Sequence, residues 1–258
     1  TGVVFSITSV INGSFSTVCF EGRPHEINAR ETLIYKSIFF ILRKVTNKMS
    51  KFAPMKGKIS EFEVMAPVGS RESLAAAIQA GADSVYFGIG KLNMRSHSAN
   101  HFNIDDLREI AATCNEHGIK TYLTVNTIIY DDDIATMKQI IDAAKEAGIS
   151  AVIASDVAVM SYCNEVGEEV HLSTQLNITN IEALKFYSRF ADVSVLAREL
   201  NMDQVKEIHE QIIAQNVCGP MGKQIRIEMF CHGALCMAVS GKCYLSLANA
   251  NRDRKSVV

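Results

Sequence analysis

Residues 61–87 read EFEVMAPVGSRESLAAAIQAGADSVYF and contain one complete strand–helix–strand unit. The short apolar run Phe62–Ala66 predicts a strand. Ser70 is a preferred N-cap residue for the helix that follows, and Gly81 supplies the left-handed conformation that commonly ends a helix. Ser84–Phe87 predicts the next strand. This segment therefore predicts a unit in which a helix connects two strands of one sheet.

The same alternation continues along the chain to residue 230. Glycines at positions 81, 118 and 148 lie about one unit apart and are placed to end helices. Further strands are expected at Thr121–Val125, Ala151–Ala154, Val170–Leu172, Val193–Leu196 and 225–230. Helices are expected at Arg71–Ala80, from Asn103 to His117, from Asp131 to Gly148, after Asp156, from Thr179 to about Arg189, and from Asn201. Repeated units of this size predict a parallel sheet with helical crossovers.

Two arrangements of such units compete: an open doubly wound sheet and a (β/α)8-type barrel. No Gly-x-Gly-x-x-Gly follows the first strand, so the dinucleotide-binding form of the open sheet loses its usual support. We therefore predict an α/β fold of the TIM-barrel type. Only seven strands are readable, so we expect the barrel to be incomplete.

Length and composition set broad limits on the class of protein. The chain has 258 residues, of which 48% are hydrophobic, enough for one sizeable domain with or without an extension. The net charge of −2 gives no global sign of nucleic-acid binding, although a local basic patch stays open. Seven cysteines without a secretory signal favour a reducing cytoplasm. No apolar run reaches the roughly 18 residues that span a bilayer, so no membrane partner is expected.

Residues 1–57 lack the strand–helix rhythm of the rest of the chain. Their most apolar run, Leu33–Leu42, is interrupted by Lys36 and is too short to cross a membrane. We expect residues 1–57 to be an irregular extension outside the fold, and residues 58–258 to form the barrel domain.

Residues 228–246, EMFCHGALCMAVSGKCYLS, hold three of the seven cysteines beside a histidine and two glycines. Thiolates are soft ligands that suit iron–sulfur clusters and zinc, and glycine lets the backbone approach a metal closely. The alternative is that these cysteines are small buried hydrophobic residues. The spacing contains no Cys-x-x-Cys pair and matches no common zinc pattern.

This spacing, Glu-x-Phe-x-x-Gly-Ala-x-Cys followed by Gly-x-Cys-x-x-Ser, resembles the signature of the peptidase U32 family. The matching positions are Glu228, Phe230, Gly233, Ala234, Cys236, Gly241, Cys243, Leu245 and Ser246. The resemblance extends upstream through segments that include 66–70, 80–88, 93–95, 173–180 and 196–200, and covers about residues 61–252. It also implies a barrel fold.

In such barrels the loops that follow the strands form the working face. We predict catalytic roles for His232, Arg95, Asn126, Asp156, Arg198 and Glu199, and substrate-binding roles for Asn93, Ser173, Gln175 and Asn177. Arginine can grip a carboxylate or phosphate through two hydrogen bonds, and the amides can read a planar polar group. A histidine titrates near neutral pH and can transfer a proton. The structural alternatives are a helix cap at Asp156 and a surface ion pair between Arg198 and Glu199.

The resemblance implies oxygen-independent hydroxylation of a tRNA wobble uridine, a ribosomal RNA cytidine or a quinone precursor. Prephenate is the implied oxygen source, and a four-iron cluster on four cysteines is the implied cofactor. Cys236 and Cys243 match its first two ligands, and Cys231 or Cys218 would substitute only if the fold brought them close. After Asn251-Arg252 the chain departs from the family pattern. We therefore expect a domain that lacks its C-terminal part, has an incomplete ligand set and is inactive by itself.

The implied partners are tRNA or another RNA, a small carboxylate and a partner subunit. A collagenase-type peptidase is the alternative, since the family name implies one. The sequence contains neither Gly-x-Ser-x-Gly nor His-Glu-x-x-His, although Cys236 and His232 could form a nucleophile pair. A truncated, non-catalytic scaffold is the third hypothesis.

Overall fold

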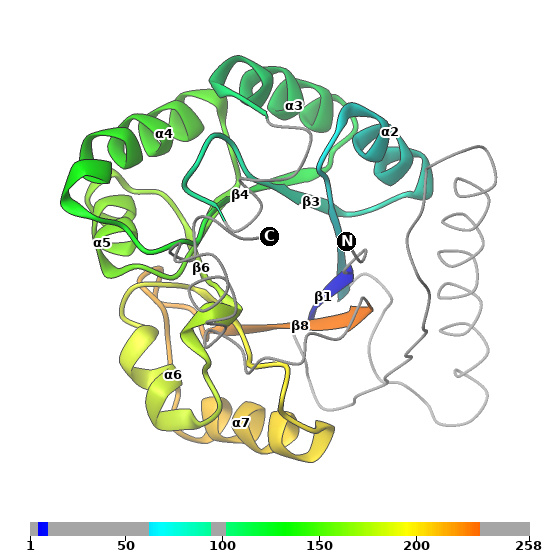
Figure 1. Ribbon diagram of the computed structural model, residues 1–258. Helices are drawn as coiled ribbons and strands as arrows, with labels where there is room; N and C mark the ends of the chain where they lie inside the picture. The colour runs from blue at the N-terminus through cyan, green and yellow to red at the C-terminus, as the bar shows by residue number, and fades with distance from the viewer. Residues whose placement is uncertain (1–4, 10–61, 94–101, 233–258) are drawn as a thin grey trace, which may run out of the picture.

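The strands of the protein form one barrel with helices around its outside, as the computed structural model shows (Figure 1). The structure describes residues 5–9, 62–93 and 102–232. The predicted α/β barrel is confirmed. Among the described helices, none is long and apolar enough to cross a membrane.

Seven strands of the barrel run parallel, and each pairs with the next in chain order. They are β2 (Phe62–Pro67), β3 (Ser84–Phe87), β4 (Lys120–Val125), β5 (Ala151–Ala154), β6 (Val170–Leu172), β7 (Val193–Val195) and β8 (Arg226–His232). All seven predicted strands are present, with ends that differ by at most two residues. Because the strands are parallel, their carboxyl ends lie at one mouth of the barrel.

Strand β1 (Phe5–Ser9) occupies the place between β2 and β8 and runs antiparallel to both. A curled sheet of seven strands would leave two edges with unpaired backbone groups, and β1 pairs with both edges. Figure 1 shows it, in blue, between the cyan and orange strands. Residues 5–9 thus lie within the sheet, whereas we expected all of residues 1–57 outside the fold. The other residues of that extension lie outside the described ones.

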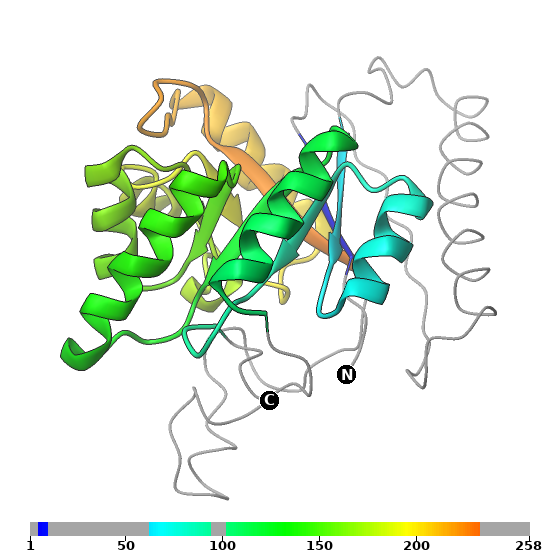
Figure 2. The ribbon, with the colours of Figure 1, turned by 90° about the horizontal axis from the view of Figure 1, so that it is seen from above.

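In the described part of the chain, six α-helices connect the strands. They lie on the outside of the barrel, as the turned view of Figure 2 also shows. They are α2 (Arg71–Ala80), α3 (Ile104–Glu116), α4 (Ile134–Ala147), α5 (Val157–Val166), α6 (Ile181–Tyr187) and α7 (Met202–Ala214). Two 3-10 turns follow strands at the mouth of the barrel: η2 (Asp131–Asp133) after β4 and η3 (Thr174–Leu176) after β6.

The helix ends follow the predicted capping chemistry, with one correction. Ser70 accepts a hydrogen bond from the Ser73 N–H, and Gly81 ends the same helix at a φ of +79°. The helix predicted from Thr179 begins later, at Ile181. Asn180 is the N-cap of α6 instead, because its extended backbone lets its side chain accept from the Ala183 N–H at 2.9 Å.

Side chains alternate along each strand between two packed regions. The outward set, which includes Val85, Leu123, Val152, Leu172 and Ile227, packs in the main hydrophobic core with residues of the helices. The inward set includes a small apolar cluster of Met65, Tyr86, Tyr122, Ala151 and Ile153. The rest of the barrel interior holds charged and polar groups.

Candidate functional site

Asn126 and Ser173 lie at the mouth of the barrel, at the carboxyl ends of β4 and β6. Val125 and Leu172 belong to the main core outside the sheet, so the residue after each of them turns toward the barrel axis. Strand β5 lies between them and ends at Ala154. The two polar side chains, which come from non-adjacent strands, contact each other across its end.

These two residues and Gln175 form one hydrogen-bonded cluster. The Asn126 Nδ2 donates to Ser173 Oγ and to Gln175 Oε1, both at 3.3 Å. The Ser173 hydroxyl donates to Gln175 Oε1. Ser173 is 3% exposed and Asn126 is 9% exposed, whereas Gln175 is half-buried. The structure thus brings together three of the predicted site residues, and all three are neutral.

Asp156 joins two loops at the same mouth. Its Oδ1 accepts from the Ala158 N–H at 2.9 Å, which makes it the N-cap of α5. Its Oδ2 accepts from the Ile129 N–H at 3.1 Å, in the loop after β4. The Asp156 carboxylate, which we predicted to be catalytic, therefore holds the backbone at the start of α5 and in the loop after β4.

Asn93 has a comparable place in the loop after β3. Its Nδ2 donates to the backbone oxygens of Ile89 and Gly90, at 3.0 and 3.1 Å. A Cβ at Gly88 would lie 2.3 Å from the Asn93 Cγ, so only glycine leaves room for this side chain. Asn93 is 3% exposed, and its hydrogen bonds hold the turn at Ile89 and Gly90.

Asn177 ends η3 with a left-handed backbone, at a φ of +52°. Its Oδ1 is buried without a hydrogen-bond partner, which makes it a further polar group beside the cluster. Arg198 and Glu199 are exposed in the turn after β7. The remaining predicted residues, Arg95, Cys236, Cys243 and the side chain of His232, lie outside the described residues.

The described cysteines do not assemble a metal site. Cys231, in β8, is half-buried and packs against the main core. Cys218 precedes β8, so these two thiols lie at opposite ends of that strand. The length of the strand separates them by roughly 20 Å. Burial raises the pKa of the Cys114 thiol to about 11 and that of Cys163 to about 12, so both stay protonated. In the described part of the chain, no group of three or more His, Cys, Asp or Glu residues is placed to hold a metal ion.

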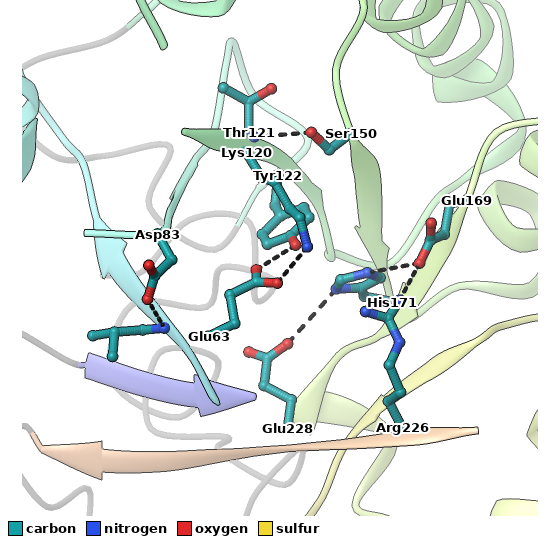
Figure 3. Close-up of polar contacts among 11 residues, drawn as sticks. Glu63, Asp83, Lys120, Thr121, Tyr122, Ser150, Glu169, His171, Arg226 and Glu228 are labelled. Carbon is teal, nitrogen blue, oxygen red and sulfur yellow. Dashed lines mark hydrogen bonds and ion pairs between the residues drawn. The ribbon is translucent and has the colours of Figure 1, made fainter. Parts of the chain in front are cut away.

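A second polar cluster fills the barrel below the mouth and comes entirely from alternate strands (Figure 3). Inward side chains of alternate strands form the layers of such barrels, and branched apolar residues usually fill them. Here β2, β4, β6 and β8, or the residue just before the strand, supply Glu63, Lys120, Tyr122, Glu169, His171, Arg226 and Glu228. We call this set the lumen network.

His171 is the centre of the lumen network and is 1% exposed. Its Nε2 lies 3.4 Å from the Glu169 carboxylate, and its Nδ1 lies 3.7 Å from that of Glu228. The Tyr122 ring packs on the imidazole, with 4.6 Å between ring centroids. Arg226 also pairs with Glu169. Burial alone would lower the pKa of His171, but the two carboxylates outweigh it and raise that pKa.

The other end of the lumen network is the pair of Glu63 and Lys120, whose Oε2 and Nζ atoms lie 2.6 Å apart. The Tyr122 hydroxyl donates to the same carboxylate. Burial would raise the pKa of Glu63, but the hydrogen bonds from Lys120 and Tyr122 hold it below its usual range. Burial, together with the Glu63 charge, raises the pKa of Tyr122. With His171 protonated, three cations balance three carboxylates.

Sequence reasoning assigned no role to the lumen network, although Glu228 is part of the signature. A usable signal was present: charged or polar residues interrupt apolar strands at Glu63, His171 and Glu228. Such residues inside a sheet covered on both faces require partners. Their partners could be named only after the barrel closes.

A parallel α/β barrel with polar groups at the carboxyl ends of its strands defines a class of proteins that bind and transform ligands at that mouth. Within this class, the sequence matches the description "Peptidase family U32" over residues 69–256. The chain belongs to the peptidase U32 family.

Relatives of this chain carry two kinds of name. A "Collagenase" of Porphyromonas gingivalis is 70% identical over 193 residues, which cover 75% of this chain and 47% of the relative. "tRNA hydroxylation protein P1" of Bacillus subtilis is 32% identical over 81% of this chain and 48% of the relative. "23S rRNA 5-hydroxycytidine C2501 synthase" of Escherichia coli is 34% identical over 74% of this chain and 27% of the relative. The chain thus spans less than half the length of each.

Proposed function

We propose that this chain is the barrel part of an RNA-modifying enzyme that hydroxylates a tRNA uridine without molecular oxygen, with prephenate as the oxygen source. The observation that carries this proposal is the neutral cluster of Asn126, Ser173 and Gln175 at the mouth of the barrel. Amide and hydroxyl groups bind and orient a polar ligand. Two relatives are named for hydroxylation, and we propose the same reaction for the ligand bound here.

The same cluster weighs against nucleophilic hydrolysis at this mouth. A serine nucleophile needs a base that accepts its proton. The Ser173 hydroxyl donates to the Gln175 carbonyl oxygen instead, which cannot remove a proton. These groups therefore favour binding over attack.

The proposed cofactor is a four-iron cluster with Cys236 and Cys243 among its ligands, and it would supply the redox chemistry. Because these residues lie outside the described ones, the role of the described groups is limited to binding and positioning. Asn126 and Gln175 would hold the ligand, and Asp156 would fix the loops around them. The rest of a longer protein or a partner subunit would supply the missing cluster ligands.

The test is complementation of a bacterial strain that lacks its own tRNA hydroxylation genes. The full-length gene that contains this chain is expressed in that strain without oxygen, and 5-hydroxyuridine is measured in digested tRNA by mass spectrometry. We expect the modified nucleoside to return, and to disappear again when prephenate synthesis is blocked. Its absence from tRNA in the complemented strain removes the proposal.

A collagenase-type peptidase is the second candidate, because the relative with 70% identity has that name. Its test is cleavage of gelatin by the same purified full-length protein. Cleavage that is lost in Cys236→Ser or His232→Ala would support the peptidase. We expect no cleavage above that of a control purified from cells with an empty vector.

A further inference from the structure

Gln175 is held in one orientation by its two partners in the mouth cluster. Its Oε1 receives hydrogen bonds from both the Ser173 hydroxyl and the Asn126 Nδ2. Rotating the Gln175 amide by half a turn would place its NH2 group against the NH2 group of Asn126. Both groups are donors, so no hydrogen bond would form between them. The carbonyl oxygen of Gln175 is therefore turned inward, toward the cluster.

This orientation leaves the Gln175 Nε2 on the side away from the cluster. Gln175 is half-buried, whereas Ser173 and Asn126 are buried, so Gln175 is the member of the cluster with the most surface open to solvent. An NH2 group has two donors and no acceptor. A ligand at the mouth therefore meets a fixed pair of donors at this position.

We propose that Gln175 is a specificity-determining residue that donates to a carbonyl or carboxylate oxygen of the ligand, and that Ser173 is the positioning residue that sets its orientation. This inference rests on the proposed function only for the choice of ligands to test. The acceptor oxygen has two sources in that reaction: a carboxylate of the small acid and a carbonyl of the pyrimidine base. A group that offers only N–H donors at that position is rejected, because two donors cannot pair.

The test replaces the donor without changing its shape. Gln175→Glu keeps an oxygen for Ser173 and Asn126 to bind and turns the outward NH2 group into a second oxygen. Binding of two probes to the full-length protein, purified without oxygen, is measured by calorimetry. The probes are prephenate and a stem-loop RNA with one uridine in its loop. Gln139→Glu is the matched control, because Gln139 is exposed on α4.

We expect Gln175→Glu to weaken the binding of one probe by at least about tenfold, since a lost donor is replaced by a repelling acceptor. The probe that is weakened identifies the source of the oxygen. Gln139→Glu should bind both probes like the original protein. Unchanged binding of both probes to Gln175→Glu overturns the proposal, and so does a failure of the original protein to bind either.

The positioning role of Ser173 has its own readout. Ser173→Ala should weaken the same probe by roughly threefold to tenfold, because only the hydrogen bond from Asn126 then holds the Gln175 amide in its orientation. In the Gln175→Glu background the same substitution should have no further effect on Kd, since Ser173 acts through Gln175. Additive losses in the double variant would show a general structural role and overturn the positioning half of the proposal.

The experiments distinguish a failure of the proposed function from a failure of the role assigned to Gln175. If tRNA in the complemented strain lacks 5-hydroxyuridine while Gln175→Glu weakens binding, the proposed function is removed and the role of Gln175 stands. If the nucleoside forms and Gln175→Glu binds both probes normally, the function stands and the assignment of Gln175 is wrong.

Discussion

At the scale of single residues, His171 is the most constrained group in the described part of the barrel. It lies between two carboxylates, and an aromatic ring covers its face. Buried ion pairs gain little over well-packed apolar residues, but removal of one partner leaves a buried charge that is costly. The stability of the barrel should therefore depend on keeping the lumen network intact.

Replacement of His171 by leucine should destabilise the protein by about 3–5 kcal/mol, because Glu228 then loses its buried cation. The double variant with Glu228→Leu should recover part of this loss. Urea unfolding of the single and double variants measures both effects. The matched control, His117→Leu at an exposed position, should change stability by no more than about 0.5 kcal/mol. A double variant less stable than His171→Leu would contradict this account of the network.

The raised pKa of His171 also makes stability depend on pH, with a defined sign. Because the folded-state pKa lies above the unfolded value, the contribution of His171 is fully present below about pH 6.5. It is lost as pH rises through the folded pKa. The difference in unfolding free energy between the original protein and His171→Gln should thus shrink as pH rises from about pH 6 through the folded-state pKa. A difference that grows over this range would show the opposite shift.

At the scale of elements, the mouth of the barrel depends on a few side chains that bond to the backbone. Asp156 caps α5 and also holds the loop after β4 through the Ile129 N–H. Asn93 holds the loop after β3 in the space that Gly88 leaves. These side chains form hydrogen bonds with backbone groups in the described parts of the loops after β3 and β4.

Asp156→Ala should cost about 0.5–2 kcal/mol of stability, as expected for loss of an N-cap, and should free the Ile129 N–H to exchange with solvent. Asp156→Asn is the comparison, because its one amide oxygen can still cap the helix whereas its NH2 group cannot accept from the Ile129 N–H. It should therefore keep the cap but also free that N–H to exchange. Hydrogen exchange and urea unfolding measure the two effects. Slow exchange at Ile129 in Asp156→Ala would mean that another group holds the loop.

Strand and helix positions were predictable from the sequence because each unit carries its own local signals, such as Ser70 and Gly81 around α2. That Asn126 and Ser173 lie at one mouth was predictable, since each directly follows a strand, whereas their role as site residues stays a prediction. The lumen network was not, because Glu63, His171 and Glu228 come from strands that meet only across a closed barrel. The role of β1 was missed for the same reason: its partners β2 and β8 are far away in sequence.

At the scale of the whole molecule, the barrel divides into two functional layers. The lumen network ties alternate strands together with balanced charges, and the neutral cluster above it faces the mouth. Members of the U32 family carry names for different reactions on related sequences. The fold alone therefore does not fix which reaction a member carries out.

The most direct test of the central claim joins the mouth cluster to the proposed reaction. The complemented strain is made with the original full-length gene, with Asn126→Ala and with Asn115→Ala, an exposed residue of α3, as the control. The 5-hydroxyuridine content of tRNA is then compared at equal protein levels. We predict at least about a tenfold loss of 5-hydroxyuridine for Asn126→Ala and no change for Asn115→Ala. Equal 5-hydroxyuridine in all three strains would contradict the assignment of the mouth cluster as the functional site.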